Sequence, residues 1–131
     1  MGKIKVLLAI RPRMLADVVR HLIARQPDMA VVSDVIDLTE LLLAIRTTEA
    51  EVVIITPADA DREPGICSDL LLAYPQLKIM ALSAKGDTAV LYQSSSRQKH
   101  MDDVGEASIL GAIREFGLDN RSTSNGVKRS N

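Results

Sequence analysis

Aromatic residues and cysteine are scarce in this chain of 131 residues. It has two tyrosines, one phenylalanine, no tryptophan and a single cysteine, Cys67. One cysteine excludes an internal disulfide and a cysteine-rich zinc cluster, and it fits a reducing, cytoplasmic compartment. With so few aromatic rings available, we expect the core to consist of aliphatic side chains.

An excess of charge of one sign is also missing, as is a long apolar run. The formal net charge is −1, so nothing indicates a surface for nucleic acid or for a charged membrane. No apolar run approaches the roughly 20 residues of a membrane-spanning helix, and the N-terminus shows no signal-peptide pattern. With 47% hydrophobic and 25% charged residues, the composition is typical of one globular domain.

Short apolar segments alternate with helical patterns along the first two thirds of the chain. The most apolar segment, Val52–Thr56, has the pattern of a strand that is buried on both faces of a sheet. Amphipathic segments between the strands predict helices. This β-α order predicts a parallel sheet with helices on both faces. The expected strands are 4–9, 29–35, 51–56 and 78–83, and the expected helices are 13–25, 38–47 and 64–74.

The rhythm changes after the fourth strand. Lys85, Gly86 and Asp87 form a turn pattern, and the next strand-like run, Ala89–Tyr92, follows at once. A parallel crossover needs about a dozen residues or more. We therefore expect a hairpin that returns the fifth strand antiparallel, with the fourth helix missing. The alternative is that 87–93 is a short helix and the fifth strand is lost.

The remainder of the chain carries weaker patterns. Residues 94–105 are polar and predict a long loop, and apolar spacing over 105–116 predicts a final helix. Residues 117–131, rich in Ser, Asn and charge, predict a disordered tail. We therefore expect one domain, 1–116, followed by that tail.

Three segments resemble the receiver domains of two-component response regulators. They are the opening segment Lys5–Asp28, the strand region Ala50–Thr56 and the strand region Tyr74–Ala84, with a weaker likeness over Glu106–Arg114. The resemblance implies a doubly wound, mostly parallel, five-stranded α/β sheet of the flavodoxin- and CheY-like order 2-1-3-4-5. It also implies a role in signal transduction.

The residues that carry receiver chemistry in that family are replaced here. The resemblance places Ile10 and Arg11 where an acidic pair binds magnesium, and Thr56 where an aspartate accepts phosphate. Ser83 matches the hydroxyl residue after the fourth strand, whereas Tyr92, or the residue after it, stands where a lysine ends the fifth. Magnesium prefers carboxylate oxygens, and phosphoryl transfer needs an activated nucleophile. We therefore predict a non-enzymatic pseudo-receiver without bound magnesium or any other cofactor.

Alternatives stay open for several of these residues. Arg11 is either a fixed cation that replaces the metal, paired with Asp59 or Asp61, or a solvated loop residue. The acidic loop that holds these aspartates either binds a metal alone or is solvated. Thr56 and Ser83 either hold a small ligand at the strand ends or only cap the strands.

The candidate interaction surface is the leucine run of the third helix, Leu70–Leu72. Its apolar side chains spread over more than one helix face, which normally means burial on more than one side. Either the fifth strand and the 94–105 loop cover this surface, or it is an interface. With the fourth helix missing, we predict an exposed patch that forms a homodimer. The candidate residues are Leu70, Leu71, Val90 and Tyr92.

The leading hypothesis is a signalling module that acts by protein–protein interaction, either through self-association or by docking an unidentified protein partner. One alternative is a small-ligand sensor that uses the pocket at the carboxyl ends of strands one and three. Another is the regulatory domain of a transcriptional regulator whose output domain is absent. Neither nucleic acid nor a membrane is an expected partner of this domain.

Overall fold

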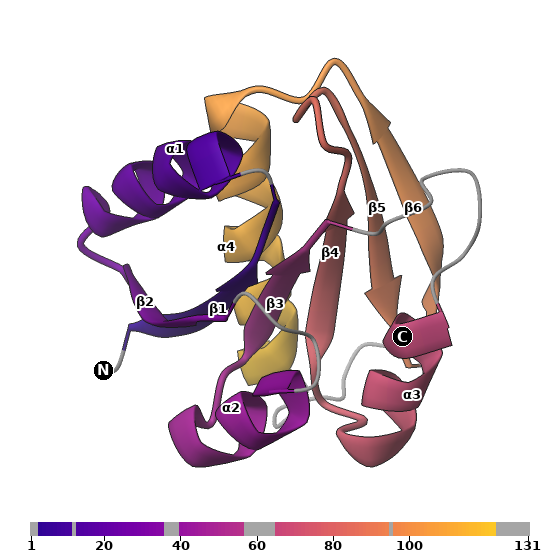
Figure 1. The fold of residues 1–131 in the computed structure, drawn as a ribbon. Coiled ribbons are helices and arrows are strands. Elements are labelled where there is room, and N and C mark those ends of the chain that lie inside the picture. The colour runs from indigo at the N-terminus through magenta and orange to yellow at the C-terminus, as the bar shows by residue number, and fades with distance from the viewer. Residues whose placement is uncertain (1–2, 12, 36–39, 57–64, 95, 123–131) are drawn as a thin grey trace.

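The structure is a computed structural model that describes residues 3–11, 13–35, 40–56, 65–94 and 96–122. A six-stranded sheet lies at its centre and helices cover both faces (Figure 1). The strands are β1 Ile4–Ala9, β2 Met29–Asp34, β3 Val52–Ile55, β4 Lys78–Leu82, β5 Thr88–Gln93 and β6 Ser96–Asp102. The helices are α1 Arg13–Ala24, α2 Leu41–Thr48, α3 Gly65–Ala73 and α4 Glu106–Ser122.

The sheet has the order β2-β1-β3-β4-β5-β6. The first four strands in this order run parallel to their neighbours. β5 returns antiparallel to β4, and β6 is antiparallel to β5. The predicted doubly wound order 2-1-3-4-5 is confirmed, and so is the antiparallel fifth strand. The alternative of a short helix over 87–93 is wrong.

Two aliphatic layers pack against the sheet, one on each face. Successive β1 residues alternate between them: Val6 and Leu8 join the layer beneath α1 and α4, while Leu7 joins the layer beneath α2 and α3. All four β3 residues are buried, because β3 has a strand on each side and a layer on each face. The expected aliphatic core is confirmed, since Tyr92 is the one buried aromatic side chain among those described.

The hairpin between β4 and β5 turns where the sequence predicts. The Gly86 amide donates to the Ser83 carbonyl at 2.8 Å, and the Ser83 amide donates to the Thr88 carbonyl at 2.9 Å. Gly86 has φ +77°, a left-handed conformation that glycine adopts without a side-chain clash. Only a short turn separates the strands, so no crossover helix fits.

The long loop predicted over 94–105 is wrong, because most of it is β6. Ser96–Asp102 supplies backbone partners to the outer edge of β5, whose N–H and C=O groups would otherwise face solvent. A strand in this place needs little apolar side-chain surface, and a polar composition protects a sheet edge from unwanted pairing. Hydrophobic periodicity therefore did not reveal it.

The last helix is longer than predicted. α4 continues to Ser122, so residues 117–122 of the expected tail are helical, and residues 123–131 lie outside the described residues. Within the described ranges, no helix combines the length and apolar character needed to cross a membrane.

Candidate functional site

Four of the predicted site residues lie at one edge of the sheet. Ile10 and Arg11 follow β1, Thr56 follows β3, and Ser83 follows β4. These strands are parallel neighbours, so their carboxyl ends meet at the same edge, and the Thr56 amide donates to the Ala9 carbonyl at 3.2 Å. Ile10 is buried and Arg11 is exposed.

Tyr92 does not belong to this group. Its partner in the antiparallel ladder is Ile79, near the start of β4, whereas Ala89 pairs with Leu82 at the end of β4. Tyr92 is also buried in the layer beneath α2 and α3. The resemblance assumed a parallel fifth strand; reversing the strand moves its last residues to the opposite end of the sheet.

Ser83 serves the hairpin. Its hydroxyl donates to the Asp87 carboxylate at 3.0 Å and accepts from the Thr88 amide at 3.2 Å. Both partners lie in the same turn, so this geometry supports the strand-capping alternative for Ser83.

The Thr56 hydroxyl differs from the hydrogen-bonded Ser83 hydroxyl. Its Oγ1 is buried, and it makes no hydrogen bond with the part of the chain that the structure describes. A buried hydroxyl without a partner carries a desolvation penalty. Asp59 and Asp61 lie outside the described residues, so the pairing of Arg11 with either one stays a prediction.

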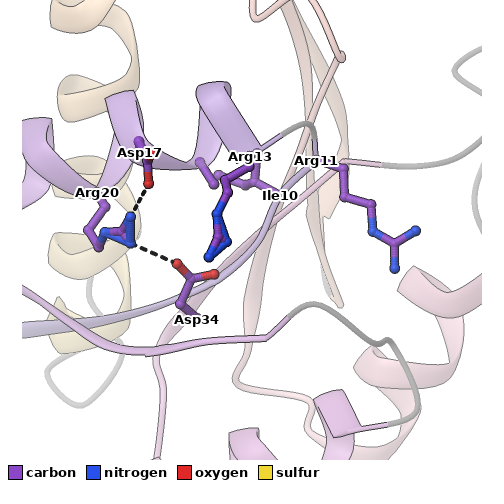
Figure 2. Close-up of a pocket in the computed structure, with 7 residues that line it drawn as sticks. Ile10, Arg11, Arg13, Asp17, Arg20 and Asp34 are labelled. Carbon is purple, nitrogen blue, oxygen red and sulfur yellow. Dashed lines mark hydrogen bonds and ion pairs between the residues drawn. The ribbon is translucent and has the colours of Figure 1, made fainter.

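A cavity of about 290 Å³ opens beside Ile10, on the β2 side of β1. It is formed by the end of β1, the first two turns of α1 and the end of β2 (Figure 2). The predicted pocket lay between the carboxyl ends of strands one and three, whereas this cavity lies on the other side of β1, between the ends of β1 and β2. Its lining residues are Ile10, Arg11, Arg13, Ala16, Asp17, Arg20 and Asp34.

An ion-pair cluster forms the inner wall of this cavity. Arg20 bonds to the Asp17 carboxylate one turn earlier in α1, and its Nη1 donates to Asp34 Oδ2 at 3.1 Å. One guanidinium thus contacts both carboxylates, and the three groups together keep one negative charge. Figure 2 shows Arg13 reaching from the start of α1 toward Asp34, while the guanidinium of Arg11 lies apart from the others.

Sequence reasoning missed Arg13, Asp17, Arg20 and Asp34, although signals for them existed. Residues 13, 17 and 20 follow the i, i+4, i+7 spacing of one helix side. Asp34 ends the strand that pairs with β1, and its ladder partner is Leu8, two residues before Ile10. Combining the helix spacing with the strand order would have brought these side chains together.

A second cavity lies at the opposite edge of the sheet. This cavity of about 510 Å³ separates the ends of α2 and α3, and its wall includes Glu49, Glu51 and Tyr74. It faces the amino ends of β3 and β4, whereas open α/β sheets bind ligands at the carboxyl ends. Among the described residues, no three His, Cys, Asp or Glu side chains gather as a metal site.

The predicted interaction patch is largely covered. Leu70 and Tyr92 are buried in the same layer, so neither contributes exposed surface, and these two assignments are wrong. Leu71 and Val90 are partly buried against that layer. The alternative in which the leucine run is repacked therefore holds for Leu70. The exposed leucine of α3 is Leu72, whose side chain is 82% accessible.

The chain matches no protein-family model and no curated protein. The fold therefore defines its class: an α/β protein with a flavodoxin-like sheet, parallel in the order 2-1-3-4 and extended by two antiparallel strands.

Proposed function

We propose that this protein is a receiver-like signalling module that acts through protein–protein interaction and without phosphorylation. The observation that carries the proposal is the chemistry between β1 and β3. There, the described residues present a buried isoleucine, Ile10, and a buried threonine hydroxyl, Thr56, in place of carboxylates. The doubly wound sheet order supports the receiver likeness.

Each replacement removes a chemical group that phosphoryl transfer requires. Ile10 offers no oxygen to a magnesium ion, and the positive charge of Arg11 repels one. The Thr56 hydroxyl has no hydrogen-bond partner in the described part of the chain that would act as a base. A threonine without an adjacent base is a weak nucleophile. The chain therefore combines a doubly wound sheet with positions that lack the carboxylates for metal binding and phosphoryl transfer.

Incubation with acetyl phosphate and magnesium, followed by intact mass spectrometry, tests the absence of phosphorylation. We expect the mass to stay that of the unmodified chain. A stoichiometric gain of one phosphate would contradict the proposal, and its loss under mild base would identify an acyl phosphate on a carboxylate rather than an ester on Thr56. Thr56→Ala is the matched control, because a gain that survives this substitution is located at another residue.

Self-association through α3 is the interaction that we propose. Leu72 is exposed on α3 and adjoins the partly buried Leu71. Two copies related by a twofold axis would bury both Leu72 side chains, since one patch then meets itself. Helix α2 lies on the same face of the sheet as α3 (Figure 1), and it carries two further exposed leucines, Leu42 and Leu43.

Light scattering at increasing protein concentration tests this dimer. We expect the mass of a dimer for the unmodified protein and the mass of a folded monomer for Leu72→Asp. Val18→Asp, which places the same charge on an exposed residue of α1 on the opposite face of the sheet, should leave the dimer intact. A monomer at high micromolar concentration in the unmodified protein would rule out self-association and leave docking of another protein.

A small-ligand sensor is the second candidate function. The cavity beside Ile10 favours it, because the cavity lies at the carboxyl edge of the sheet and is lined by charged side chains.

A further inference from the structure

We propose that the cavity between the ends of α2 and α3 receives the Leu72 side chain of a second copy of this chain. The two copies then exchange their Leu72 side chains across a twofold axis, rather than only placing one Leu72 against the other. This inference rests on the proposed function, because it names the surface through which the α3 dimer forms.

An exposed leucine and a cavity lie next to each other at the end of α3. The Leu72 side chain is 82% accessible, and the next two residues, Ala73 and Tyr74, line the cavity of about 510 Å³. In a twofold interface, one surface has to be complementary to itself. A surface with both a projecting side chain and a hollow meets this condition, because each copy supplies the leucine for the cavity of the other.

The cavity has apolar walls that suit a leucine side chain. Ile45 and Leu77, which are buried in the layer beneath α2 and α3, line it. The partly buried side chains of Ala50 and Tyr74 pack against the same layer and also line the cavity. Transfer of an exposed leucine from water to such surroundings is favourable, and a twofold dimer makes this transfer twice.

Two opposite charges at the cavity also fit a second copy. Arg46, in the last turn of α2, and Glu51, just before β3, both line the cavity. Glu51 Oε1 accepts a hydrogen bond from the Lys5 backbone amide at 3.1 Å, a neutral donor that leaves the carboxylate its charge. The Lys5 side chain lies 3.5 Å from Glu49 instead. Within the described ranges, Arg46 takes part in no ion pair.

A twofold axis brings these charges together in pairs. Arg46 of one copy faces the partner's Glu51, and the same contact forms a second time with the roles reversed. Together with Lys5 and Glu49, these groups carry no net charge. A cavity rim of one sign would repel a copy of itself and favour a partner of the opposite sign, whereas a rim with both signs is complementary to a copy of itself.

Charge reversal in mixed samples tests the pairing between copies. Arg46→Glu and Glu51→Arg each place like charges at both contacts, so either variant alone should raise the dimer dissociation constant about tenfold or more. An equimolar mixture of the two variants should recover the dimer, because each contact between the copies then joins a glutamate to an arginine. Light scattering measures the mass of all three samples, and circular dichroism checks that each variant is folded.

A matched control separates this contact from general electrostatics. Arg25→Glu makes the same change of charge on an exposed residue just beyond α1, whose helix packs on the other face of the sheet, and should leave the dimer intact. Equal weakening by Arg25→Glu and Arg46→Glu, or a mixture of folded variants that stays monomeric, would overturn the proposed pairing.

The position of Leu72 is measured in the unmodified protein, so this test decides even if a variant does not fold. In a sample that mixes isotope-labelled and unlabelled chains, isotope-filtered NMR should show contacts between the Leu72 methyl groups of one chain and the Ile45 or Leu77 methyl groups of the other. Contacts between the two Leu72 side chains alone would overturn the cavity while leaving the α3 dimer in place. A monomeric unmodified protein would refute the dimer itself, and this inference with it.

Discussion

The carboxyl ends of β1 and β3 lead into separate segments of the chain, whereas the carboxyl end of β4 turns directly back into β5. In the parallel part of the sheet, made of β2, β1, β3 and β4, side chains that are distant in sequence meet at the edge formed by the carboxyl ends of the strands. In the antiparallel part, made of β4, β5 and β6, neighbouring residues occupy the same edge. The connections, rather than the strands, thus determine which polar groups remain available.

Ser83 and Thr56 show this difference with similar side chains. The Ser83 hydroxyl has two hydrogen bonds inside its own hairpin. The Thr56 hydroxyl, which follows a strand of the parallel part, is buried without a partner in the described residues. A hairpin satisfies its polar groups locally, while the ends of parallel strands depend on residues from elsewhere in the chain.

The largest expected effect is in the buried centre of the parallel part. Ile54→Ala should lower the free energy of unfolding by about 2 to 5 kcal/mol, because Ile54 is fully buried and its loss leaves a cavity. Val90→Ala in β5 is the comparison, and its loss should be smaller because Val90 is only partly buried. Urea unfolding measures both. Equal losses would show that the two parts of the sheet are equally tightly packed.

The hairpin of the antiparallel part is tested at Gly86. Gly86→Ala should cost about 1 to 2 kcal/mol, because an L-residue disfavours φ +77°. The new Cβ would also lie 3.1 Å from Leu15 Cδ1. Gly111→Ala is the matched control: its Cβ meets nothing within 4 Å, and alanine favours the helix by about 0.5 to 1 kcal/mol. Thermal unfolding should therefore shift in opposite directions for the two variants.

The unpartnered hydroxyl of the parallel part offers a smaller gain. Thr56→Val keeps the shape of the side chain and removes the buried hydroxyl, so we expect a stabilisation of up to about 1 kcal/mol. Thr56→Ser retains the hydroxyl and should not stabilise the protein. If Val destabilises more than Ser in chemical denaturation, the hydroxyl has a partner in solution and the comparison with Ser83 fails.

The smallest effect concerns the contact between α4, which follows the antiparallel part in the chain, and the segment just before β2 of the parallel part. Arg114 of α4 donates through Nε to Asp28 Oδ2 at 2.9 Å and through Nη2 to Gln26 Oε1 at 2.8 Å. The hydrogen bond to Asp28 raises the pKa of Arg114. A raised pKa contributes stability that is lost only as the pH rises through the folded-state value, which for arginine is in strongly alkaline solution. Salt is therefore the useful variable.

Arg114→Gln should lower the melting temperature slightly at low salt, and the difference should shrink near 1 M salt, where the Debye length is about 3 Å. Lys99→Gln is the control, because the Lys99–Glu115 pair is longer, at 3.9 Å, and well exposed. A decrease for Arg114→Gln that persists at high salt would indicate packing rather than charge.

Much of the fold was predictable from local patterns. Buried apolar runs such as Val52–Ile55 identify the parallel strands because a central strand must be apolar on both faces. The short spacing around Gly86 identifies the hairpin because a parallel crossover does not fit. Both arguments depend on chain length and hydrophobicity, which the residues specify directly. At the site, Ile10, Arg11, Thr56 and Ser83, which the family resemblance singled out, follow parallel neighbouring strands and lie at one edge.

Tertiary structure decided the remainder. β6 forms because the edge of β5 requires backbone hydrogen-bond partners. The polar side chains of Ser96–Asp102 give no hydrophobic pattern that would predict this pairing. The reversal of β5 moved Tyr92 away from the edge that family likeness had assigned to it. The cavity arises because α1 and the end of β2 place Arg20 against Asp34, 14 positions apart in the chain. Such contacts depend on how elements pack in space, so periodicity within one segment does not contain them.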